Sequence, residues 1–133
     1  MLTLIEICGF LKSKINVNGV IAAGRIDQSS DFSIGVYDDN RGKTTRRAIG
    51  GPQNTKFYKL TVTILIHKRG GQNEALSKAQ EVYKALNGLT DFYIAENHIA
   101  FVCPYIPQCV GYTSNGDYEY TVEAEFYVNK EEI

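Results

Sequence analysis

The segment Tyr58-Lys59-Leu60-Thr61-Val62-Thr63-Ile64-Leu65-Ile66-His67 alternates apolar and polar side chains along most of its length. Because successive side chains of a strand point to opposite faces, this alternation predicts a strand with one apolar face and one polar face. The segment Tyr118 to Val128 has the same period, and its polar face carries Glu119, Glu123 and Glu125. The two segments therefore predict long strands of a sheet with one face against the core.

Two segments with helical spacing lie on either side of the first of these strands. Thr3 and Glu6 form the pattern of a capping box before an apolar stripe, which predicts a helix over residues 2–15. A second helix is expected over residues 73–87, with Asn73 as its N-cap and Gly88 in a left-handed conformation at its end. Shorter strands are expected at residues 20–26, 32–37 (half-buried), 98–103 and 110–113, with an Asn115-Gly116 turn before the last strand. The predicted fold is α+β with two layers, a mainly antiparallel sheet and two helices packed on one face, in the order α-β-β-α-β-β.

Length and composition indicate one folded domain over residues 1–133. Hydrophobic residues make up 44% of the 133-residue chain and charged residues 22%, and the formal net charge is −1. That charge argues against a nucleic-acid binder held by a global positive field. No apolar run is long enough to cross a bilayer, and the first residues lack the features of a signal peptide, so no membrane partner is expected.

The residues offer no credible catalytic or metal site, so the chain is not expected to be an enzyme or to hold a cofactor. Gly42-Lys43-Thr44 lacks the upstream glycine and the following helix of a phosphate-binding loop. Three cysteines (Cys8, Cys103, Cys109) are an odd number at no metal-ligand spacing, and reduced thiols are the simplest interpretation, with Cys8 in the core. Neither histidine lies near a cysteine in sequence, and His67 is expected to face solvent at the end of its strand.

A polar loop over residues 38–56 is the most distinctive feature, because so long a segment without its own helix or strand is usual only for functional or disordered chain. It carries four basic residues within seven positions: Arg41, Lys43, Arg46 and Arg47. One interpretation is a solvated hairpin tip, and the other is an arm that docks on another subunit or lines a charged passage. Likewise, Glu119, Glu123 and Glu125 form either a solvated face or a stripe that meets a basic surface. Contact between the basic loop of one copy and the acidic stripe of the next would be heterologous, and such contacts can close into a ring.

The order of these elements resembles that of the small tail-terminator and minor capsid (head-tail joining) proteins of long-tailed bacteriophages. The resemblance extends over nearly the whole chain, from the capped first helix through the loop ending in residues 48–54 to the strand at 59–67. It continues through the helix at 74–88, the segment from Tyr105-Ile106-Pro107 to Gly116, and the final strand rich in glutamate.

The resemblance implies a structural protein that forms a homo-oligomeric ring, commonly a hexamer, at the head-proximal end of the tail. Such a ring is assembled in the host cytoplasm, covers the last ring of tail tube protein and stops polymerisation. It then offers a surface to the head connector or neck protein, and DNA only passes through its lumen. The basic loop would contact subunits or face the lumen, and subunit contact is favoured because a basic lumen would hinder DNA sliding.

Three other functions remain open at this stage. The chain could be another neck or head-completion protein of the same particle. It could be a small ligand-binding regulatory domain, which predicts a pocket between helices and sheet. An enzyme would require His67 or His98 to lie beside a cysteine or a glutamate.

Overall fold

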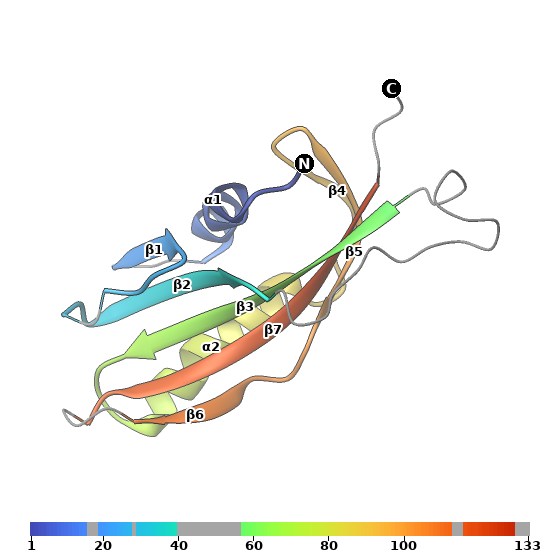
Figure 1. Ribbon diagram of the computed structural model, residues 1–133. Helices are drawn as coiled ribbons and strands as arrows, with labels where there is room; N and C mark the ends of the chain where they lie inside the picture. The colour runs from blue at the N-terminus through green and yellow to red at the C-terminus, as the bar shows by residue number, and fades with distance from the viewer. Residues whose placement is uncertain (16–18, 28, 40–56, 113–115, 130–133) are drawn as a thin grey trace.

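A computed structural model describes residues 1–15, 19–27, 29–39, 57–112 and 116–129 (Figure 1). The elements are, in chain order, α1 (Leu4–Lys14), β1 (Val20–Ala23), β2 (Phe32–Asp38), β3 (Phe57–Lys68), α2 (Gln72–Leu86), β4 (Thr90–Ile94), β5 (Asn97–Pro104), β6 (Gln108–Tyr112) and β7 (Tyr118–Asn129). The α+β class is confirmed. The predicted order α-β-β-α-β-β is wrong, because three strands separate the two helices and four strands follow the second.

The strands form one curled, mixed sheet in the order β1-β2-β3-β7-β5-β4, with β6 also paired to β7. The two longest strands, β3 and β7, are antiparallel over twelve residue pairs from Phe57↔Asn129 to Lys68↔Tyr118. β5 and β6 share the other side of β7, where β5 pairs with its second half and β6 with its first. β1 runs parallel to β2, which makes the sheet mixed.

The connection from β1 to β2 explains both the parallel pairing and the burial of β2. It passes so close to Gly35 that an added Cβ there would lie 2.6 Å from the Arg25 carbonyl oxygen and 2.7 Å from a methyl carbon of Ile26. The backbone N–H of Asp27 also donates to the Ser33 hydroxyl at 2.8 Å. Phe32–Val36 are consequently buried on both faces, whereas the sequence predicts a half-buried strand. Gly35 is required here because only glycine leaves room for the returning chain.

β4 is a strand that sequence patterns did not predict. It forms a hairpin with β5, in which Thr90 pairs with Phe101 and Ile94 with Asn97. Its second residue, Asp91, has a φ of 51° and the turn residue Ala95 a φ of 54°. These left-handed residues interrupt the regular alternation by which strands are recognised.

The helix ends follow the sequence patterns at α1 but only in part at α2. The capping box is confirmed, since the Thr3 hydroxyl accepts from the Glu6 N–H at 3.2 Å and the Thr3 N–H donates to the Glu6 carboxylate at 2.9 Å. α2 instead has Gly71 as N-cap, with no side-chain cap, so the assignment of Asn73 is wrong. Gly88 has the expected left-handed conformation, with a φ of 80°.

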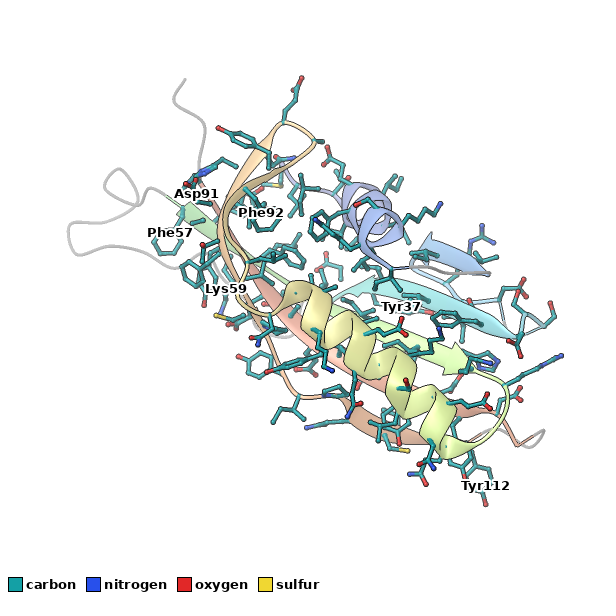
Figure 2. All side chains as sticks on the ribbon, turned by 180° about the vertical axis from the view of Figure 1, so that it is seen from behind. Tyr37, Phe57, Lys59, Asp91, Phe92 and Tyr112 are labelled. Carbon is teal, nitrogen blue, oxygen red and sulfur yellow. The ribbon has the colours of Figure 1, made fainter. Side chains whose placement is uncertain are left out.

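A single buried apolar cluster contains residues of both helices and of the central strands. Alternate residues of β3 (Val62, Ile64 and Ile66) are fully buried in it. α1 contacts β1 and β2, and α2 contacts β7 and β3, as Figure 2 shows from behind the view of Figure 1. The face of β7 that carries the glutamates is the opposite one, which we call the outer face. Among the described residues, no helix is long and apolar enough to cross a membrane.

Replacement of Ile64 tests the importance of this central layer. Ile64 is fully buried, so Ile64→Ala should lower the free energy of unfolding by about 2–5 kcal/mol. The same replacement at Ile5, which is 74% exposed on α1, should change it by no more than about 0.5 kcal/mol. Urea denaturation followed by circular dichroism measures both values, and equal losses would contradict this placement of the core.

Candidate functional site

The acidic stripe predicted from the sequence lies on the outer face of β7. The long register with β3 places Glu119 opposite His67, Glu123 opposite Thr63 and Glu125 opposite Thr61. All three glutamates are partly exposed. They therefore form a row along the polar side of the two central strands, as the period of two requires.

The contacts of Glu125 and Glu119 are made with residues of the same chain. The Lys59 ammonium lies 3.4 Å from the Glu125 carboxylate, and the Tyr127 hydroxyl donates to the same carboxylate at 3.1 Å. Glu119 lies 3.0 Å from His67 Nδ1. The outer face of β7 is therefore partly neutralised by neighbouring strands. The Lys59 contact follows from the register of β3 and β7, which places Lys59 and Glu125 diagonally across the two strands.

His67 is fully buried, so the prediction that it faces solvent is wrong. The imidazole lies between β2, where Ser33 is its pairing partner, and β7, where Glu119 is opposite. The connection between β1 and β2 covers this end of the outer face through its hydrogen bond to Ser33. The segment before β7 adds a second carboxylate, with Asp117 Oδ2 at 3.5 Å from His67 Nε2.

The cluster around His67 has the chemistry of a structural polar core. Nε2 makes no hydrogen bond, and at 3.5 Å its contact with Asp117 is electrostatic. The Arg69 guanidinium lies 3.7 Å from the same carboxylate. The histidine–glutamate contact that an enzyme would require is thus present, but a fully buried imidazole has no surface at which to meet a substrate.

His98, the second histidine, joins the β4–β5 hairpin to the end of β7. Its Nε2 lies 2.5 Å from the Asp91 carboxylate, and Nδ1 makes a short contact with the Asn129 amide. Asp91 is largely exposed, so this contact is on the surface. Through its two ring nitrogens, His98 of β5 therefore links Asp91 of β4 to Asn129 of β7.

All three cysteines are free. Cys8 is buried on α1, as predicted, and burial raises the pKa of its thiol. Cys103 is half-buried at the end of β5, and Cys109 is exposed on β6. Within the described residues, no group of three or more His, Cys, Asp or Glu side chains has the geometry to hold a metal ion.

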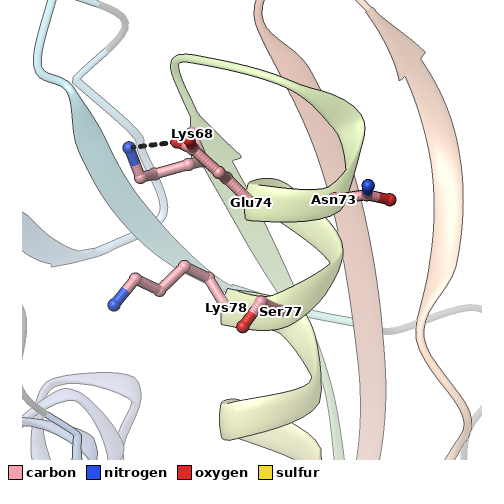
Figure 3. Close-up of a pocket in the computed structure, with 5 residues that line it drawn as sticks. All are labelled: Lys68, Asn73, Glu74, Ser77 and Lys78. Carbon is pink, nitrogen blue, oxygen red and sulfur yellow. Dashed lines mark ion pairs between the residues drawn. The ribbon is translucent and has the colours of Figure 1, made fainter.

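A surface pocket of about 360 Å³ lies where β3 leads into α2 (Figure 3). Its lining residues are Lys68, Asn73, Glu74, Ser77 and Lys78. The Lys68 ammonium lies 2.9 Å from Asp31 and 3.5 Å from Glu74, and Asp31 raises the pKa of Lys68. Lys78 lies over the Phe32 ring and beside Glu81. Since both cations already have partners, the pocket gives no specific support to a ligand-binding function.

The other predicted contact residues lie outside the described part of the chain. These are Arg41, Lys43, Arg46 and Arg47, together with the Gly42-Lys43-Thr44 segment. At the start of the predicted loop, Asp38 ends β2, and the N–H of buried Asp39 donates to the Thr61 carbonyl at 3.0 Å.

Comparison with protein families identifies the class of protein. Residues 16–130 match the family described as bacteriophage tail terminator protein. The chain is a structural protein of a phage tail and a component of the virion. It belongs to the bacteriophage tail terminator family. No match was found among curated proteins or among solved structures.

Replacement of His67 should destabilise the protein much more than replacement of His98. His67→Ala leaves the buried Asp117 carboxylate and the partly exposed Glu119 carboxylate without the imidazole between them, which should lower the free energy of unfolding by about 1–3 kcal/mol. His98→Ala removes a surface contact and should cost less. Chemical denaturation of both variants at neutral pH provides the comparison. Equal losses of unfolding free energy would show that the buried cluster stabilises the protein no more than the surface contact of His98 does.

Thiol labelling should separate the three cysteines by exposure. An aromatic disulfide reagent should react first with Cys109, and with Cys8 only after unfolding, because Cys8 is buried and its thiol pKa is raised. The fast phase, read from absorbance of the released thiol, should disappear in Cys109→Ser. A fast phase that persists in this variant would mean that another thiol is the accessible one.

Proposed function

We propose that this protein caps the head-proximal end of the tail tube, stops tube polymerisation and supplies the surface that the head connector or neck protein binds. The observation that carries the proposal is the match of residues 16–130 to the tail terminator family. The buried position of His67 also supports a structural role, because it removes the His67–Glu119 pair from contact with a substrate.

The proposed working form is a homo-oligomeric ring, with a hexamer as the expected size, through which DNA passes without specific contact. In this ring, Arg41, Lys43, Arg46 and Arg47 of one copy contact Glu119, Glu123 and Glu125 of the next. The position of the three glutamates supports the contact, since all lie on the outer face of one long strand. Guanidinium groups bind carboxylates in bidentate geometry, so they can add to a carboxylate that already has one partner.

Tail length is the measurement that tests the proposal. Without the protein, the purified tail tube protein should polymerise into tubes of variable and excessive length. With it, elongation should stop and the protein should be found at one tube end by electron microscopy. Normal tail lengths without the protein, combined with heads that fail to join, would instead indicate a neck or head-completion protein.

Charge reversal in the loop tests the proposed subunit contact. Arg46→Glu with Arg47→Glu should weaken ring formation by at least about tenfold, because like charges then face each other across the contact. Lys84→Glu, at an exposed position of α2, is the control for a change of charge alone. Light scattering across salt concentrations measures assembly, and an unchanged ring in the double variant would exclude this loop contact.

A further inference from the structure

The segment from Tyr105 to Tyr112 carries the densest group of exposed apolar side chains in the described chain. Four of its eight residues are large, apolar and exposed: Tyr105, Ile106, Val110 and Tyr112. Ile106 is 74% exposed and Tyr112 is 71% exposed, and Figure 2 shows Tyr112 at the end of β6. Val110 and Tyr112 lie on β6, and Tyr105 and Ile106 lie in the segment before it. Exposed apolar side chains gathered in one segment mark an interaction site more often than isolated ones do.

β6, within this segment, is also an open edge of the sheet. It pairs with β7 on one side, and among the described residues no strand pairs with its other side (Figure 1). A bulge between Cys109 and Gly111 interrupts its ladder with β7. An open edge presents unpaired backbone N–H and C=O groups that another strand can bind.

β1 is an open edge at one end of the strand order, on the other side of β2, β3 and β7 from β6. It has four residues, against five in β6, and in the described chain it pairs only with β2. Three exposed basic residues lie close to β1 along the chain. Lys12 and Lys14 are in the last turn of α1, before β1, and Arg25 is two residues after β1. α1 packs against β1, so the edge of β1 has a basic border.

The β6 end of the sheet has an acidic border instead. The Tyr105 N–H donates to the Glu123 carbonyl at 2.8 Å, and the carboxylates of Glu125 and Glu123 raise the pKa of the Tyr105 phenol. Two β6 edges brought together would also bring these carboxylates together, which like-charge repulsion disfavours. The basic border of β1 is the complementary partner that this chain itself offers.

We propose that the β6 edge of one copy binds the β1 edge of the next copy, so that the sheet continues from subunit to subunit. This inference rests on the proposed function, because it names the surfaces that build the ring. The contact joins two different surfaces and is heterologous, so its repetition adds subunits beyond a dimer and closes into a ring where the rotation between copies allows. It is separate from the proposed loop contact, because it does not use Arg46 or Arg47.

A lysine at the β6 edge tests the apolar part of the contact. Val110→Lys should reduce the assembled fraction at least about tenfold, because the ammonium must lose its water where the β1 edge docks. Tyr93→Lys is the matched control, since Tyr93 is an exposed residue of β4, another edge strand. Thermal unfolding by circular dichroism should show that both variants remain folded, because both side chains are exposed.

Cross-linking tests the identity of the partner edge. In a continuous sheet, Ala23 lies on the same face as Cys109, because their pairing partners Val36 and Tyr120 both face the buried cluster. A short bis-maleimide should therefore join Cys109 to the new thiol of Ala23→Cys in the neighbouring copy and produce a ladder of multimers. The ladder should be lost when Cys109→Ser is added. Mass spectrometry of the joined peptides identifies the two positions.

The outcomes separate this inference from the proposed function. A 23–109 cross-link on rings assembled at tube ends, together with loss of assembly in Val110→Lys, supports the β6–β1 contact. A 109–109 link that stops at dimers overturns it, and so does a Val110→Lys variant that assembles normally. A Val110→Lys variant that forms rings but no longer binds tubes would show that β6 binds the tube protein instead. Failure of the unmodified protein to stop tube growth would overturn the proposed function, while the cross-link in concentrated solution still decides between the edges.

Discussion

The pairing of β3 with β7 is the interaction on which the rest of the structure depends. Twelve residue pairs join two strands that lie far apart in the sequence. α2 packs on the apolar face of this pair of strands, and the opposite face carries the acidic stripe and the His67 cluster. A shift of one residue would exchange these two sides and bury the glutamates, so burial of the apolar side fixes the register.

The sequence predicted the parts of the fold that depend on local pattern. Regular alternation identified β3 and β7, and capping chemistry identified the start of α1. It could not predict that β1 is parallel to β2 or that His67 is buried, because both depend on the path of the connection beside Gly35. β4 was missed because the left-handed Asp91 disturbs its period.

The candidate site was predictable to a similar extent. The period of two placed Glu119, Glu123 and Glu125 on one face, but the intrachain partners Lys59 and His67 became evident only from the strand order. The open edges of β6 and β1 had no sequence signal of their own. Whether a strand is central or at an edge is a property of the topology. β6 is also short, because Pro107 comes directly before it, and a bulge interrupts its ladder with β7.

The position of β7 in the sheet has a consequence for how the protein is made. β7 lies between β3 on one side and β5 and β6 on the other, yet it is the last of the described strands to leave the ribosome. Until β7 is synthesised, β3 and β5 each lack one neighbouring strand, and the apolar face of the sheet on which α2 packs is incomplete. The nascent chain must therefore wait with open strand edges until its central strand arrives, and during this interval contact with other chains competes with folding.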